Sequence, residues 1–172
     1  MKKITLIVLS LSLTWQINAQ TSENFLQKRN ELKLDVAYFF VPALKIEYEF
    51  LLNNWSSIGL YAFHNFRSAP IFKNQILGNY RVYLGLLPDK GGFFIEGNLG
   101  LFHGYNSWDL FEPYPKNHTA FGIGFALGWK WYIRKSDIVF EIFAGTGGLF
   151  SNNDRSNGRG YPRLGICVGK RF

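Results

Sequence analysis

The feature that most constrains this chain is an alternation of apolar and polar residues that recurs along residues 31–172. In residues 44–52, for example, the even-numbered residues are apolar and the odd-numbered residues include Lys45, Glu47 and Glu49. Residues two positions apart lie on the same face of a strand, so each such segment predicts a strand with one apolar and one polar face. The predicted strands cover residues 31–40, 44–52, 56–66, 75–86, 92–105, 120–134, 137–150 and 162–172.

The connections between these segments alternate in length. Short connections lie at 53–54, 88–91 and 135–136, and longer polar ones at 67–74, 106–119 and 151–160. The connection near 41–43 is an exception, because it is tight although it falls on the long side. Short periplasmic turns and long extracellular loops are typical of outer-membrane barrels. We therefore predict an all-β fold, an antiparallel eight-stranded up-and-down transmembrane β-barrel.

A soluble ligand-binding barrel is the alternative, since it would bury the apolar face that a membrane barrel turns to lipid. The apolar face carries several large side chains per strand, more than the narrow interior of an eight-stranded barrel can hold. The opposite face combines charged residues with glycines such as Gly124 and Gly128, which we expect to leave room for long neighbours such as Arg81 and Lys130. Both observations favour the membrane barrel.

The charges on the predicted inward face nearly balance. Because buried charge is tolerated when it is paired and hydrogen-bonded, we predict a cross-barrel network of ion pairs that fills the interior and closes it to solutes. The predicted core of this network is Glu47, Glu49, Arg81, Glu96, Lys130, Glu141 and Arg163. Further predicted inward-facing charges are Glu31, Lys33, Asp35, Lys45, Arg134 and Arg171.

The first 19 residues have the composition of a cleaved signal peptide. Lys2 and Lys3 precede an apolar stretch at 4–13, and Ala19 supplies a small residue before the predicted cleavage site. This stretch is too short to span a bilayer as a helix. We therefore predict export, with residues 20–30 as a polar N-terminal extension and residues 31–172 as the barrel in the outer membrane.

The distribution of aromatic residues agrees with a membrane location. Aromatic residues gather toward strand ends, as the belts at membrane interfaces require. Candidates for these belts are Tyr38, Phe39, Trp55, Trp129, Trp131 and Tyr132. The amphipathic last segment closes on Phe172, a pattern that we interpret as the signal read by the outer-membrane assembly machinery. Outer-membrane lipid and this machinery are the predicted partners.

Two stretches resemble a family of small Gram-negative outer-membrane β-barrels grouped as a domain of unknown function. One is 44–50, followed by Asn53, Asn54 and residues 55–59, and the other is 80–84 followed by 90–97. The resemblance spans most of residues 31–172. It implies a fold and a location, and because the family carries no established activity it transfers no catalytic residue.

The predicted function is that of a non-enzymatic outer-membrane protein, structural or binding through its extracellular loops. Trp108, Phe111 and Tyr114 are the candidate contact residues of the longest loop. The sequence does not specify the ligand that such a loop would bind. No cofactor and no metal site are predicted, since His103 and His118 are isolated from each other and from Cys167. Basic residues are scattered despite the net charge of +7, so we predict no nucleic-acid binding.

The alternative function is a membrane-embedded enzyme that modifies lipid A, of the deacylase or acyltransferase type. Such chemistry needs a histidine beside a serine nucleophile, oriented by a carboxylate or an amide. His64 with Asn65 and Ser68 is the nearest candidate set. Its spacing departs from the deacylase pattern, in which the serine follows the histidine more closely.

Overall fold

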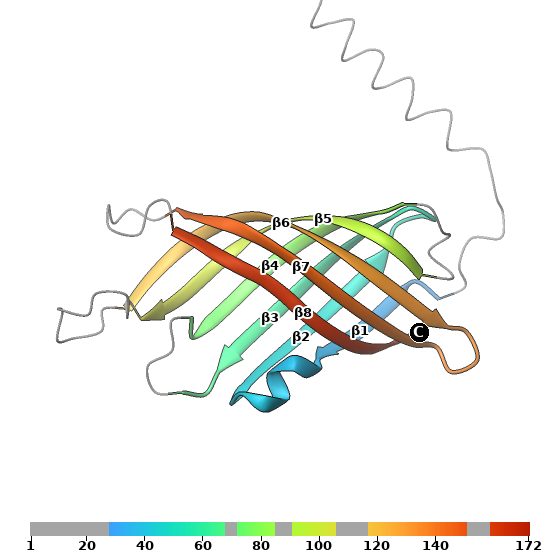
Figure 1. The fold of residues 1–172 in the computed structure, drawn as a ribbon, viewed down its shortest axis with the longest axis horizontal. Helices are drawn as coiled ribbons and strands as arrows, with labels where there is room; N and C mark the ends of the chain where they lie inside the picture. Colours follow the sequence, from blue (N-terminus) through green and yellow to red (C-terminus); the bar gives the residue numbers. More distant parts are fainter. Residues whose placement is uncertain (1–27, 68–71, 85–90, 106–116, 151–158) are drawn as a thin grey trace, which may run out of the picture.

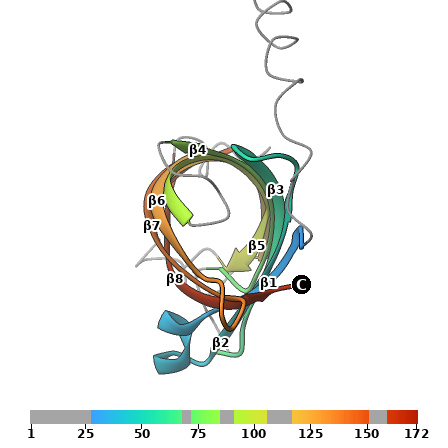
Figure 2. The same ribbon diagram turned by 90° about the vertical axis from the view of Figure 1, so that its right-hand side faces the viewer.

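The computed structural model describes residues 28–67, 72–84, 91–105, 117–150 and 159–172. Within them, eight strands form a closed antiparallel barrel, in which consecutive strands pair and β8 closes the ring on β1 (Figures 1 and 2). The strands are β1 (Asn30–Asp35), β2 (Ala43–Leu51), β3 (Ser56–Asn65), β4 (Asn74–Leu84), β5 (Gly91–Tyr105), β6 (Asn117–Ile133), β7 (Ile138–Phe150) and β8 (Arg159–Arg171). This architecture confirms the predicted fold class. No helix in the described part of the chain has the length and hydropathy needed to cross a membrane.

The first strand is shorter than predicted, and the connection after it is longer. β1 ends at Asp35, and the 3-10 helix η2 (Val36–Phe40) follows at the end of the barrel that carries the longer connections (Figure 1). The Asp35 carboxylate caps this helix by accepting a hydrogen bond from the Ala37 backbone N–H at 3.2 Å. The prediction of a tight connection near 41–43 was therefore wrong, because a side-chain cap turns the chain out of the strand earlier.

Exposure alternates along the strands as the sequence pattern predicted. On β2 the side chains of Lys45, Glu47 and Glu49 are buried, whereas those of Leu44 and Ile46 are exposed. The charged face therefore lines the interior and the apolar face covers the outside. This inside-out arrangement is the reverse of a soluble globular domain.

One predicted inward-facing charge lies elsewhere. β6 ends at Ile133, so Arg134 belongs to the turn before β7 and is exposed. The prediction extended the alternation of β6 by one residue too many. Asp137, the last residue of this turn, has a φ of 57° and reverses the chain direction.

Aromatic rings fill much of the interior that the charges leave free. One buried cluster contains Tyr61, Phe63, Leu77, Phe102, Ala120, Leu149 and Tyr161, and a second contains Leu51, Tyr83, Phe94, Phe143 and Cys167. Several inward-facing glycines make room for these rings. A Cβ at Gly147 would overlap the Tyr161 ring, and one at Gly128 would overlap the Phe94 ring. The glycines therefore accommodate rings more than the long cations, such as Arg81, that we had predicted.

Replacing Gly147 with alanine should destabilise the barrel by about 1–3 kcal/mol, because the added methyl group overpacks against the Tyr161 ring. Gly97→Ala is the matched control, since a Cβ at that position meets nothing within 4 Å. Urea unfolding of both variants in lipid vesicles, followed by circular dichroism, measures the difference. An equal unfolding midpoint for both variants would contradict the packing described here.

Candidate functional site

The barrel interior holds a balanced set of buried charges. The buried acids among the described residues are Glu31, Asp35, Glu47, Glu49, Glu96 and Glu141, and the buried cations are Lys33, Lys45, Arg81, Lys130, Arg163 and Arg171. Six carboxylates against six cations give a formal charge of 6 − 6 = 0. A neutral interior avoids the large penalty of an unpaired buried charge.

Glu49 on β2 is one centre of this network. Its carboxylate accepts hydrogen bonds from five described side chains, namely Lys33 Nζ, Ser57 Oγ (2.5 Å), Arg81 Nη1 (2.6 Å), Tyr83 Oη and Lys130 Nζ (2.9 Å). These donors come from β1, β3, β4 and β6. One carboxylate on β2 therefore also binds side chains of β4 and β6, with which β2 shares no backbone hydrogen bonds.

Arg81 on β4 is the second centre. Its guanidinium lies 2.6 Å from Glu49, 2.6 Å from Glu47, 2.8 Å from Glu96 and 3.0 Å from Glu141. These acids lie on β2, β5 and β7. A planar guanidinium with several fixed donors suits this role better than an ammonium group would.

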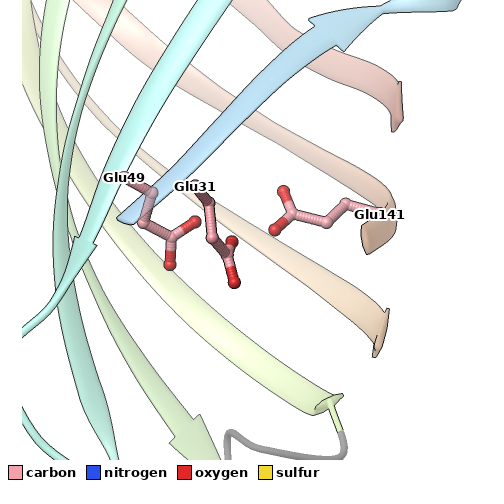
Figure 3. A group of neighbouring side chains, drawn as sticks. All are labelled: Glu31, Glu49 and Glu141. Atoms are coloured by element: carbon pink, nitrogen blue, oxygen red, sulfur yellow. The ribbon is translucent and has the colours of Figure 1, made fainter. Parts of the chain in front are cut away.

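Three carboxylates lie close enough to suggest a metal site. Figure 3 shows Glu31, Glu49 and Glu141 pointing toward one another from three strands, and one oxygen of each lies within 4.8 Å of the others. The Lys130 ammonium, however, lies 2.9 Å from Glu31, 2.9 Å from Glu49 and 3.1 Å from Glu141. Lys33 also contacts Glu49 and Glu141. These two ammonium groups already supply the cations that the carboxylates need.

A second part of the network lies closer to the long connections. Arg163 on β8 donates to Glu96 at 2.8 Å, and its guanidinium carbon lies over the rings of Tyr61 and Phe143, at 4.5 and 4.4 Å from their centroids. Lys45 lies 2.9 Å from Asp35. Contact with aromatic rings adds a favourable interaction to a cation that has lost its water.

All seven residues of the predicted network core are therefore brought together in the interior. The sequence reasoning missed some of their uncharged partners. Ser57 and Tyr83 bind Glu49, and the Tyr161 hydroxyl donates to Asn98 at 2.5 Å. The alternation along the strands could have identified them. Residues an even number of positions apart share a face of a strand, and each of these residues shares its face with inward-facing residues of its own strand.

The predicted loop contacts Trp108, Phe111 and Tyr114 lie outside the described residues, as do residues 1–27 with the predicted signal peptide, and Ser68 of the alternative catalytic set. His64 is described, and its Nδ1 lies 2.7 Å from Asn74 Oδ1. Its amide partner is therefore Asn74 on the neighbouring strand, and the predicted partner Asn65 instead accepts a hydrogen bond from the Arg67 backbone N–H at 3.0 Å. His103 Nδ1 lies 3.1 Å from Thr119 Oγ1, and Cys167 is buried with a free thiol.

Apart from Phe125 at the middle of β6, the exposed aromatic side chains of the described residues fall into two groups on the outside of the barrel. Near the short turns they are Tyr48, Trp55, Tyr80, Trp129, Trp131, Phe140 and Phe172, and near the long connections they are Phe39, Phe40, Phe66, Phe121 and Phe150. Two predicted members lie elsewhere. Tyr38 packs on Phe63 with ring centroids 5.1 Å apart, and the Tyr132 ring lies under the Arg171 guanidinium at 3.9 Å. Both rings therefore contact buried side chains of the barrel interior.

The last residue takes part in closing the ring. The Phe172 backbone N–H donates to Asn30 O at 2.8 Å, and Phe172 O accepts from the Asn30 N–H at 3.1 Å. The Phe172 ring is exposed on the outer face. An exposed terminal ring is compatible with the predicted assembly signal, which stays a prediction.

The barrel is similar to the crystal structure of the N-terminal beta-barrel domain of Pseudomonas aeruginosa OprF, with a TM-score of 0.53 and 16% sequence identity. The alignment covers 85% of this chain and 98% of the OprF domain. At this identity the likeness concerns the fold. No known family model matches the sequence, and no curated protein matches it. The family resemblance noted in the sequence therefore stays a prediction.

Glu49→Gln should destabilise the folded barrel by about 3–5 kcal/mol, because it leaves buried cations without one of their acceptors. Urea unfolding in vesicles, followed by the gel shift between folded and unfolded chain, measures this loss.

Asp137→Asn is the control, since it makes the same carboxylate-to-amide change in a turn outside the barrel interior. Hydrogen bonds from Lys28 and Tyr132 hold the pKa of Asp137 below its usual value, but this partly exposed site is screened by water. Little change is expected for Asp137→Asn, and a similar loss for both variants would argue against a special role of the interior network.

Proposed function

We propose that this chain is a non-enzymatic outer-membrane β-barrel protein. Charged side chains fill the centre of its barrel, and its long connections are available for structural contacts or binding. The observation that carries this proposal is the inverted burial pattern. Fully buried charges line the interior, whereas large apolar side chains on every strand are exposed on the outside.

The outer surface is suited to lipid. Exposed residues such as Leu60, Ile76, Leu99, Phe125 and Ile142 continue around the barrel from strand to strand. A continuous apolar surface of this kind is typical of membrane proteins and would aggregate in water. The closed ring also satisfies the backbone of the strands internally, which lipid requires. The two groups of exposed aromatic residues then lie where interfacial belts are expected.

The two ends of the barrel suggest its orientation. Asn30 and Phe172 lie at the end with the short turns, as Figure 1 shows for the C-terminus, and η2 lies at the opposite end. Barrels of the outer membrane keep short turns on the periplasmic side and longer loops outside. We therefore place the long connections at the extracellular surface, and the predicted signal peptide of residues 1–19 supports export.

Binding through the loops is proposed by elimination. The charges around Glu49 and Arg81 at the centre of the network are paired with one another, the outer surface is suited to lipid, and the turns at the opposite end are short. The connection between β5 and β6 contains Trp108, Phe111 and Tyr114 in its sequence, and aromatic side chains are frequent in contact surfaces.

A lipid A-modifying enzyme is the second candidate. The observation in its favour is the hydrogen bond between His64 and the Asn74 amide, which would hold the imidazole of a general base in one orientation. His64 lies near the end of β3 that carries the long connections. A change in the lipid A acyl pattern of a strain that lacks the gene would favour this candidate over the first.

Ile46→Arg should destabilise the barrel by about 2–4 kcal/mol in vesicles, because it places a charge on the lipid face near the middle of β2. Phe40→Arg is the depth control, since Phe40 lies in η2 beyond the strand ends and is 94% exposed. Unfolding midpoints in vesicles compare the two variants. If Ile46→Arg is silent and the chain stays monomeric in buffer without detergent, the membrane assignment is wrong.

Deleting residues 109–116 should leave the barrel folded and abolish the phenotype that the intact gene restores in a null strain. Deleting residues 152–157, in the connection between β7 and β8, is the matched control and should leave that phenotype intact. Heat-modifiable migration on a gel reports folding of both variants. Full rescue by the 109–116 deletion would place the function elsewhere, and loss of folding would show that this segment is structural.

A further inference from the structure

We infer that the end of the barrel interior beside the long connections is a binding site for a small organic carboxylate with a flat apolar body. This inference goes beyond the proposed function, because it concerns the interior of the barrel and neither its loops nor its lipid face. It depends on a cavity, on the charge of the residues around it, and on a buried donor without a partner.

The cavity has a volume of about 310 Å³ and lies at the end of the barrel interior that is next to the long connections. Its wall includes Tyr38 of η2, Lys45 of β2, Tyr61 of β3 and Arg163 of β8, together with Arg67 and Phe72 from the connection between β3 and β4. Ligand pockets in proteins begin at about this size. A molecule of one ring and a head group fits this volume.

The charges of the described residues that line this cavity are of one sign. Three of them, Lys45, Arg67 and Arg163, are cationic, and among the described lining residues none is acidic. Asp35 and Glu96, which pair with Lys45 and Arg163, are not among the described lining residues. This part of the wall favours an anion over a neutral or cationic molecule.

Arg163, one of the lining residues, has a donor without a partner. Its Nη1 is buried and makes no hydrogen bond within the described residues, and Arg163 as a whole is only 2% exposed. A buried unsatisfied donor of a charged group is unfavourable, so this guanidinium keeps unused capacity for a carboxylate acceptor. Lys45 Nζ donates to Asp35 Oδ2 at 2.9 Å and to Leu164 O at 3.4 Å. Since an ammonium has three protons, it can give its third to the same carboxylate.

Four of the other described lining residues are aromatic and favour a flat apolar ligand body, namely Tyr38, Tyr61, Phe63 and Phe72; the remaining ones are Asn65, Gln75, Pro162 and Leu164. Tyr61 contacts both cations, with its ring centroid 5.0 Å from Lys45 Nζ and 4.5 Å from the Arg163 guanidinium carbon. Phe72 packs on Phe102 with ring centroids 5.4 Å apart, and Tyr38 packs on Phe63. Rings prefer offset or edge contacts with a flat apolar partner. An aromatic monocarboxylate combines this body with the anionic head.

Fluorine NMR of 4-fluorobenzoate, titrated with the folded chain in an uncharged detergent, tests this site. We expect saturable line broadening with the wild-type chain, and none with 4-fluorobenzamide or 4-fluorobenzylamine, which keep the ring and lose the anion. Acetate should compete poorly, because it lacks the ring. Equal broadening by the neutral amide, or equal competition by acetate, would overturn the inference.

Three variants locate the binding. Lys45→Met should weaken it about tenfold or more, because a charge-assisted hydrogen bond is lost. Arg67→Gln, at an exposed position that leaves the interior network intact, should weaken it about three- to fivefold. Lys135→Gln removes the same charge from the turn at the opposite end and should change nothing.

Gel migration with and without heating shows whether each variant is folded. If Lys45→Met does not fold, Arg67→Gln still decides. Binding that is unchanged in Arg67→Gln, or weakened equally in Lys135→Gln, would show that 4-fluorobenzoate responds to net charge and that the cavity is not its site. Absence of saturable binding to the folded wild-type chain would also overturn the inference, while leaving the proposed membrane function untouched.

Discussion

The interaction on which the rest of the structure depends is the contact of Arg81 with its surrounding carboxylates. Backbone hydrogen bonds join each strand only to its two neighbours. Arg81 on β4 contacts Glu96 on the neighbouring β5, but it also reaches acids on β2 and β7, and Glu49 on β2 binds donors on β4 and β6. The contacts between strands that are not neighbours need the curvature of the ring, so the closed shape and the neutral interior support each other.

This interior also fixes the pairing of the strands. A slip of one residue between two strands would turn every charged side chain of one strand toward the outside and every apolar one toward the interior. On β2, such a slip would place Ile46 against Arg81 and expose Glu47 to the outside. The same slip is therefore unfavourable on the inner face and on the outer face, and a single strand register suits both faces.

Most of this design can be predicted from the alternation. Residues 44–52 predicted β2 within one residue at each end, and parity assigned Glu47, Arg81 and Glu141 to the interior. The end of β1 could not be predicted in this way, because Val36, Tyr38 and Phe40 continue the apolar alternation and only the local cap by Asp35 ends the strand.

The partners that a side chain contacts across the barrel could not be predicted from the sequence either. Parity gives the face on which Lys130 lies, but its position between Glu31, Glu49 and Glu141 depends on the tilt of strands that are far apart in the chain. The same limit applies to the cavity beside Lys45 and Arg163, which comes from elements at three separate parts of the sequence.

The pairing of β1 with β8 has a consequence for how the barrel is completed. Arg171 donates to Glu31 at 2.8 Å across a sequence separation of 140 residues, and the backbones of Asn30 and Phe172 bind each other beside this pair. Until this last seam forms, the sheet has two open edges, and Glu31 lacks Arg171. Closing the seam removes both problems in one step, so the ring gains the pairing of β1 with β8 and the Arg171–Glu31 contact together. The barrel should therefore form as an all-or-none unit, with few half-open states along the way.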